Sequence, residues 1–192
     1  MIIGLTGEMG AGKSTAAQML RKTGLPVFDA DDQVHLLMKN NKELKDIFKE
    51  KFKESVTENG IDRTVLSRLI SEGKTTPEII EKLIYPFLIK ELDKFLDLND
   101  PAVLDVPLLF EAGWDKYCDK IVFLTASPET LRQRVFARPG MTEEKYEALT
   151  SRFWNNDLKK NKSDYIISTD EGLEPVERRL NEIRNELCAK SF

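Results

Sequence analysis

The chain has few of the residues that build disulfides and metal centres. Its 192 residues include one histidine, His35, and two cysteines, Cys118 and Cys188. A single histidine argues against a histidine-based zinc site and against a Ser-His-Asp triad. Two cysteines far apart in the sequence favour reduced thiols over a disulfide framework. We therefore expect a cytoplasmic protein, and the sequence assigns neither thiol a role.

Long apolar runs and an excess of positive charge are also missing. No run approaches the roughly 20 apolar residues that a membrane-spanning helix needs, and the apolar start before Gly7 is too short for the core of a signal peptide. The formal net charge is −4, which argues against nucleic-acid binding as the main function. We expect a partner that is neither a nucleic acid nor a membrane. The sequence does not indicate an oligomeric state.

The chain does show short apolar strands that alternate with helical patterns. Its length suits one α/β domain with a full core. The predicted strands are the residues before Gly7 and residues 25–30, 102–106, 120–125 and 165–168. Strands that alternate with helices predict a parallel sheet with helices on both faces. A long helical stretch up to Leu98 interrupts this alternation, and we interpret it as an insertion at the carboxyl edge of the sheet.

Local signals mark the ends of several elements. Asn59-Gly60 predicts a tight turn, because this pair tolerates the positive φ that such turns need. Pro86 is expected to start or kink a helix. Ser127 is expected to cap a helix whose first residue is Pro128, and a closing amphipathic helix is predicted at 173–187.

A phosphate-binding pattern follows the first predicted strand. Residues 7–14, GEMGAGKS, match G-x-x-x-x-G-K-[ST] in full. Glycines let successive backbone N–H groups surround phosphate oxygens, and the helix that begins near Lys13 adds the positive end of its dipole. Lys13 is expected to reach the β- and γ-phosphates, and the Ser14 hydroxyl to bind Mg²⁺. The predicted nucleotide-binding residues here are Gly7, Gly10, Ala11, Gly12, Lys13, Ser14 and Thr15.

The alternative for this stretch is a glycine-rich turn that only joins a strand to a helix. The strand before it and the helix after it favour a nucleoside triphosphate site. A second motif, NKSD at residues 161–164, matches the guanine-reading signature of GTPases. It precedes an apolar strand instead of following one, and the chain has no D-x-x-G. We therefore interpret NKSD as a chance match on a solvated turn.

Acidic residues follow two of the predicted strands. Asp29, Asp31 and Asp32 come after the second strand, at the sheet edge where ligands bind in open α/β folds. A carboxylate there can accept the proton of an attacking hydroxyl, while another caps the next helix. The strand pattern does not choose between Asp29 and Asp31. Asp105 ends another buried strand, where it would hold Mg²⁺ through water or hydrogen-bond a loop.

Five blocks of sequence carry a family resemblance. They are IIGLTGEMGAGKSTAAQML near the start, GLPVFDADDQV after it, DVPLLFE at 105–111, SPETLRQRVFARPG at 127–140 and DYIIS at 164–168. In this order, over nearly the whole chain, they resemble the dephospho-CoA kinase family. Its members are P-loop enzymes that phosphorylate the ribose 3′-hydroxyl of dephospho-CoA, the last step of coenzyme A synthesis. The resemblance implies ATP and Mg²⁺ as cofactors and dephospho-CoA as the small-molecule substrate.

The resemblance also implies roles for particular residues. Asp31, the second acid of D-A-D, would be the catalytic carboxylate that contacts the acceptor hydroxyl. Arg134 and Arg138 match the arginines at the entrance of the lid, where they would bind nucleotide, and Arg138 would join Lys13 in catalysis. Spacing alone leaves both arginines equally compatible with exposed helix charge. An arginine fork suits the charge of a transferring phosphoryl group.

A single P-loop kinase domain with three parts follows from the same resemblance. The core would comprise about 1–31, 99–138 and 163–192. The helices of about 32–98 would bind the CoA moiety, and a lid of about 139–162 would close over ATP and exclude water.

The chain departs from the family pattern at five places. They are Glu8 in place of the second glycine, Tyr85-Pro86, Arg138-Pro139, Arg152-Phe153 and Thr169-Asp170-Glu171. None removes Lys13, Ser14 or Asp31, so phosphoryl transfer is expected to survive while the grip on acceptor and adenine changes. Two other functions fit the phosphate loop: a different small-molecule P-loop kinase, and a non-enzymatic nucleotide-dependent switch.

Overall fold

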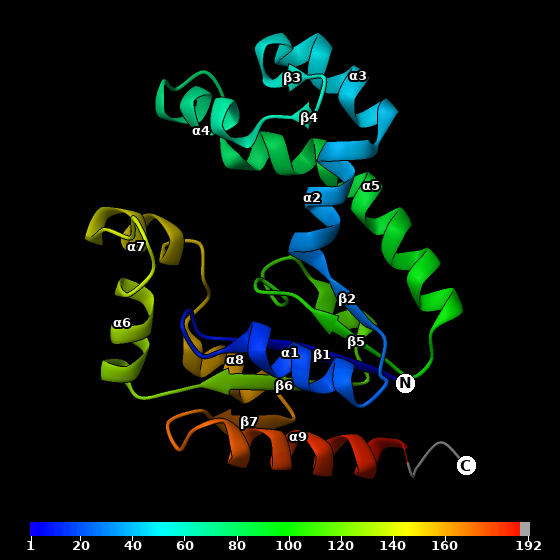
Figure 1. Ribbon diagram of the computed structural model, residues 1–192, viewed down its shortest axis with the longest axis vertical. Coiled ribbons are helices and arrows are strands. Elements are labelled where there is room, and N and C mark those ends of the chain that lie inside the picture. Colours follow the sequence, from blue (N-terminus) through cyan, green and yellow to red (C-terminus); the bar gives the residue numbers. More distant parts are fainter. Residues whose placement is uncertain (189–192) are drawn as a thin grey trace. The chain divides into compact units, whose positions relative to one another are not determined.

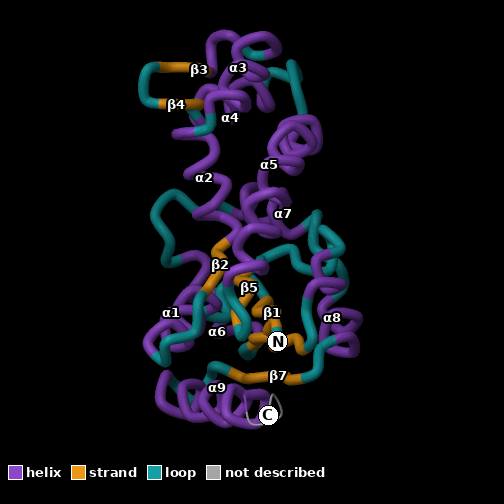
Figure 2. Tube along the Cα trace, turned by 90° about the vertical axis from the view of Figure 1, so that its right-hand side faces the viewer, coloured by secondary structure: helices purple, strands orange, loops and turns teal. Residues whose placement is uncertain are grey.

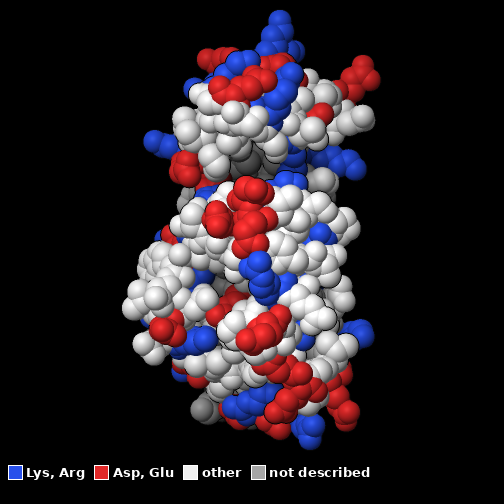
Figure 3. Space-filling view, turned by 90° about the vertical axis from the view of Figure 1, so that its left-hand side faces the viewer, with Lys and Arg blue, Asp and Glu red and all other residues white. Residues whose placement is uncertain are grey.

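The protein is described by a computed structural model that covers residues 1–188, with the Cys188 side chain outside the described part. The chain divides into two compact units, one formed by Met1–Phe28 with Asn99–Phe192 and the other by Asp29–Leu98. Within the described part, every helix is too short or too polar to cross a membrane. Acidic and basic side chains mix on the face shown in Figure 3, as near balance between 29 basic and 33 acidic residues predicts.

The first unit is built on a five-stranded sheet (Figure 1). Its strands, in spatial order, are β2 (Val27–Asp29), β5 (Ala102–Asp105), β1 (Ile2–Gly7), β6 (Lys120–Thr125) and β7 (Tyr165–Ser168). β1 pairs in parallel with both β5 and β6, and β6 pairs in parallel with β7. The central strand therefore leads into the phosphate loop at the carboxyl edge of the sheet, where ligands bind in this architecture.

One face of this sheet is covered by two helices, α1 (Lys13–Lys22) and α9 (Leu173–Cys188), which lie side by side in Figure 1. Because side chains alternate along a strand, Ile3 and Leu5 of β1 point to this face and are almost fully buried. They pack with apolar residues of the other strands and with Ala16 and Leu180 of the two helices. This layer fixes the start of α1, and with it the end of the phosphate loop.

The other face carries shorter elements, including η2 (Trp114–Tyr117) and α8 (Asn156–Lys162), which packs on β6. Gly4 of β1 faces them, and a Cβ there would lie 2.7 Å from the Cys118 sulfur. Burial, with Asp115 and Asp119 nearby, raises the pKa of Cys118 to about 12. The thiol therefore stays protonated at neutral pH. The other helices of this unit are α6 (Pro128–Phe136) and α7 (Glu143–Thr150).

The second unit is mainly helical. It contains α2 (Ala30–Asn40), α3 (Lys42–Lys51), η1 (Lys53–Ser55), α4 (Arg63–Ser71) and α5 (Pro77–Leu98). The predicted turn at Asn59-Gly60 joins two short strands, β3 (Val56–Thr57) and β4 (Gly60–Ile61), which the sequence analysis did not predict (Figure 2). Gly60 has φ of 117°, and a Cβ there would lie 2.7 Å from the Met38 carbonyl oxygen, so this position requires glycine.

Pro86 lies inside α5 instead of starting a new helix. α5 changes direction along its length in Figure 1. A proline in a helix interior removes one backbone hydrogen bond and bends the helix. The expectation of a kink is therefore met, and the α/β architecture with a parallel sheet and helices on both faces is confirmed.

A buried ion pair fixes α8 to the first unit. The Nζ of Lys159 lies 2.5 Å from Oε1 of Glu111 and 4.7 Å from the centre of the Phe153 ring, and the Lys159 side chain is 1 % exposed. The backbone N–H of Trp154 donates to the same Glu111 oxygen over 2.8 Å. Glu111 therefore holds both α8 and the loop that leads into it.

Removing one partner of this pair should destabilise the protein more than removing both. Lys159→Met leaves the Glu111 carboxylate buried without its cation, and we expect the free energy of unfolding to fall by about 3 kcal/mol. Lys159→Met combined with Glu111→Gln removes both charges, and most of the loss should be recovered. Urea denaturation of the three proteins measures this difference. A loss in the double variant as large as that in Lys159→Met, or larger, would contradict the coupling.

Candidate active site

Glycines at three positions give the phosphate loop its shape. Gly7 ends β1, and a Cβ there would lie 2.5 Å from the backbone oxygen of Leu124, so no larger residue fits between β1 and β6. Gly10 and Gly12 have φ of 91° and 84°, in the left-handed region that disfavours side chains. A Cβ on Gly10 would also lie 2.9 Å from the Leu131 oxygen. The backbone path of the loop therefore depends on glycine at these three positions.

Lys13, the first residue of α1, forms an ion pair with Asp105 at the end of β5. The Asp105 side chain is 1 % exposed and that of Lys13 17 %, so the pair is largely shielded from water. β1 and β5 are paired with Leu5 opposite Asp105, which brings the end of β5 beside the start of the phosphate loop. The sheet thus unites two residues that the sequence analysis assigned to the same site.

Ser14 and Thr15 lie in the first turn of α1 with exposed side chains. Among the residues that the structure describes, no three His, Cys, Asp or Glu side chains converge to hold a metal ion. The Ser14 hydroxyl and the Asp105 carboxylate are oxygen donors, as Mg²⁺ requires. They fit this ion when phosphate and water oxygens complete its coordination shell.

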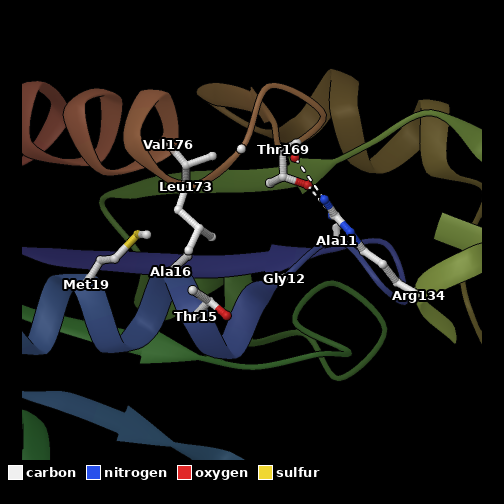
Figure 4. Close-up of a pocket in the computed structure, with 10 residues that line it drawn as sticks. Ala11, Gly12, Thr15, Ala16, Met19, Arg134, Thr169, Leu173 and Val176 are labelled. Carbon is white, nitrogen blue, oxygen red and sulfur yellow. Dashed lines mark hydrogen bonds between the residues drawn. The ribbon is translucent and has the colours of Figure 1, made fainter. Parts of the chain in front are cut away.

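A cavity of about 220 Å³ adjoins the phosphate loop (Figure 4). Arg134 of α6 lines it and donates from Nη1 to the Thr169 hydroxyl (2.8 Å) and from Nη2 to the Thr169 carbonyl oxygen (3.0 Å). Its Nη1 is also 3.5 Å from the Gly10 carbonyl oxygen. The residues around the cavity are Ala11, Gly12, Thr15, Ala16, Met19, Arg134, Thr169, Gly172, Leu173 and Val176. One wall is thus apolar, and the guanidinium plane is held at the other.

Arg138 is exposed just beyond the end of α6 and does not line this cavity. Its neighbour on α6, Arg132, instead makes a two-bond contact with Glu143 at the start of α7, at 3.0 and 2.7 Å. The hydrogen bond from Arg132 lowers the pKa of the Glu143 carboxyl. This pair links the two helices at the surface of the region expected to form the lid.

The acids that follow β2 have different roles at the start of α2. The Asp29 carboxylate caps the helix by accepting from the Asp32 backbone N–H over 3.1 Å. Asp31 and Asp32 are exposed in the first helical turn. The cap that the sequence predicted for one of these acids is therefore confirmed, and it falls on Asp29.

Asp170, which the sequence analysis names only as a departure from the family pattern, has a role near the site that was not predicted. Its carboxylate accepts from the backbone N–H and hydroxyl of Ser127 and from the hydroxyl of Ser168. Hydrogen bonding by Thr130, then by the Ser127 backbone and side chain, lowers the pKa of Asp170. Asp170 therefore holds the start of α6, the helix that carries Arg134. The sequence indicated the Ser127 cap, but no local pattern indicated that Asp170 contacts it from 43 residues away.

Asp164, the last residue of NKSD, also has a structural contact. Its carboxylate accepts from the Ile121 backbone N–H over 2.8 Å and from the Lys120 ammonium over 2.5 Å. These contacts join the starts of β6 and β7. The motif thus lies at the amino ends of the strands, the edge opposite to the phosphate loop.

Comparison with known proteins shows a consistent likeness. The family model described as dephospho-CoA kinase matches residues 1–174. A curated protein named dephospho-CoA kinase from Mesorhizobium japonicum is 37% identical over 192 residues, which cover 97% of this chain and 96% of that protein. The crystal structure of TT1252 from Thermus thermophilus is 32% identical, with a TM-score of 0.79 and 97% of both chains covered. Dephospho-CoA kinase from Campylobacter jejuni has the same fold, with a TM-score of 0.71 at 23% identity, covering 100% of this chain and 98% of that one.

Replacement of Lys13 should abolish most of any phosphoryl transfer. Lys13→Ala removes the ammonium that faces the phosphate loop, and we expect turnover to fall by at least about 100-fold, as when one preorganised charge donor is lost. Lys22→Ala, at the exposed far end of α1, is the matched control and should keep full turnover. Steady-state kinetics compare the two variants. An unchanged rate for Lys13→Ala would contradict the assignment of the loop.

Proposed function

The chain belongs to the dephospho-CoA kinase family, whose reaction is the last step of CoA biosynthesis, and we propose that its phosphate loop transfers the γ-phosphoryl group of ATP to the ribose 3′-hydroxyl of dephospho-CoA. The observation that carries the proposal is the Lys13–Asp105 ion pair at the mouth of a complete phosphate loop. It places a cation and an acid of the expected kinds side by side at the carboxyl edge of the sheet.

The phosphate loop would bind and orient the nucleotide. Gly10 and Gly12, with their positive φ, give the loop its turn, and the start of α1 adds partial positive charge beside it. Lys13 would exchange its contact with Asp105 for the β- and γ-phosphates. Ser14 and Asp105 would hold Mg²⁺, which when bound neutralises charge on the transferring phosphate. The chain's own contribution is to fix these groups before reaction.

Asp31 is our candidate for the residue that orients the acceptor hydroxyl and takes its proton. It lies in the first turn of α2, where the helix dipole stabilises a carboxylate. Asp29 already serves as the cap of that helix, so the choice that the strand pattern left open favours Asp31. A carboxylate within hydrogen-bond reach of a hydroxyl acts as a general base in such transfers.

Arg134 and Arg138 receive different parts of the nucleotide in this proposal. Arg134 lines the cavity beside the loop and offers a fixed guanidinium plane against which a base can stack. Arg138, exposed at the end of α6, is available to the transferring phosphoryl group when the lid expected at about 139–162 closes through its first half, since α8 is held by Glu111. The unit Asp29–Leu98 would bind the CoA moiety.

We place the enzyme in the cytoplasm. An ATP-consuming reaction requires a supply of nucleotide. Two cysteines in 192 residues, one of them a free thiol that stays protonated at neutral pH, agree with a reducing compartment.

ADP release from ATP and Mg²⁺ tests the proposed acceptor. With dephospho-CoA we expect rapid ADP release and CoA as the product, and with adenosine, AMP or shikimate we expect release near the background without acceptor. Mass spectrometry of the product shows the addition of one phosphoryl group, and co-elution with authentic CoA identifies its position. Faster release with one of the other acceptors, or equal release without any, would overturn the proposal.

Asp31→Asn should nearly abolish turnover and leave ATP binding close to normal. The amide keeps the shape of the side chain but cannot accept a proton, so we expect kcat to fall by about 100-fold or more. Asp32→Asn changes a neighbouring exposed acid of the same helical turn and serves as the control. If Asp31→Asn retains wild-type kcat, Asp31 is not the base.

A further inference from the structure

The phosphate loop of this chain contains a carboxylate, that of Glu8. It is 10 % exposed, accepts a hydrogen bond from the Thr125 hydroxyl at the end of β6, and lies 3.8 Å from the Lys160 ammonium of α8. A carboxylate in this loop repels a polyphosphate, since like charges near a partly buried site interact strongly. Its contacts must therefore offset this repulsion.

The backbone at Glu8 does not require glycine. Among the described residues, only glycines have positive φ, so Glu8 adopts an ordinary backbone conformation. Its N–H donates to the Leu124 carbonyl oxygen over 3.0 Å. Gly7, by contrast, has no room for a side chain. The position after Gly7 thus accepts a side chain without strain, and in this chain the side chain makes contacts on two other elements.

The helix that carries Lys160 is held in place by the residue before it. Lys159 is buried in its ion pair with Glu111, and successive residues of a helix point about 100° apart, so the two lysines reach different partners. Glu111 lies in the loop that follows β5 and Asp105, whereas Glu8 lies in the phosphate loop. Lys160 therefore contacts Glu8 from α8, a helix that the Lys159–Glu111 pair holds in place.

We propose that Glu8 is a positioning residue of the phosphate loop and that Lys160 neutralises it, so that the loop is tied to β6 and α8 without repelling the nucleotide. The hydrogen bond from Thr125 holds the loop to the strand. The ion pair with Lys160 joins the loop to α8 and offsets the negative charge of Glu8. This inference rests on the proposed function, because it assigns the loop to a nucleotide.

Three variants test the pairing by removing the positive charge, the negative charge, or both. Lys160→Met exposes the Glu8 charge, and we expect the KM and the Kd for Mg²⁺-ATP to rise about 3- to 10-fold with kcat within about twofold. Glu8→Gln removes that charge but keeps an acceptor for Thr125, so its affinity should stay within about twofold of wild type. The combined variant should regain the affinity of Glu8→Gln. Lys22→Met, which removes an exposed charge at the far end of α1, should change nothing.

The outcomes separate this proposal from a purely structural role. Thermal unfolding is measured on each variant, and loss of packing alone would lower Tm without recovery of nucleotide affinity in the combined variant. Lys160→Arg keeps the positive charge, so its affinity for Mg²⁺-ATP should stay close to that of the wild type. Unchanged affinity in Lys160→Met overturns the proposal, and so does a combined variant as weak as Lys160→Met, which would mean that Lys160 acts on the nucleotide directly.

The proposed function can fail independently of this inference. The Kd for Mg²⁺-ATP is measured by titration without acceptor, so the pattern among the variants does not depend on which acceptor the enzyme uses. Failure of the wild-type protein to phosphorylate dephospho-CoA would refute the proposed function alone. A flat series of Kd values alongside normal CoA formation would refute the role of Glu8 and Lys160 alone.

Discussion

The ion pair between Lys13 and Asp105 depends on the pairing of β1 with β5 and sets the geometry of the site. Lys13 begins the helix after the central strand, and Asp105 ends the strand beside it. The pair can form only if β1 and β5 run in parallel and in register, so that both chains leave the sheet at the same edge. Burial of Ile3 and Leu5 under α1 and α9 fixes that register, since a shift of one residue would turn these side chains to the other face.

Around this ion pair, long-range polar contacts hold two helices and the phosphate loop in place. Asp170 fixes the start of α6, Glu111 fixes α8, and Glu8 joins the phosphate loop to β6 and α8. Each contact uses an acid in one loop and a donor on a distant element. Strand pairing and these carboxylate contacts together position the site, which keeps its donors preorganised for a charged substrate.

The sequence was informative where local chemistry decides the outcome. The phosphate loop, the Ser127 cap, the Asn59-Gly60 turn and the starts of α1 and α6 follow from short-range preferences for turns, caps and periodicity. The buried state of Lys159 could not be predicted, because residues 156–162 have the composition of a solvated surface helix. The hairpin β3–β4 was missed because each strand has two residues, too few for an alternating pattern.

The burial pattern on either side of Trp154 has a consequence for motion. α7 buries none of its side chains, whereas α8 is locked by the Lys159–Glu111 pair. Movement of the segment between α6 and β7 is therefore expected in its first half, while α8 stays in place. Besides the ring contact between Tyr146 and Phe136, α7 is held by surface contacts such as Arg132–Glu143, which contribute to the balance between its positions. Such contacts weaken with ionic strength, so the kinetics of substrate entry and product exit should depend on salt even where the chemical step does not.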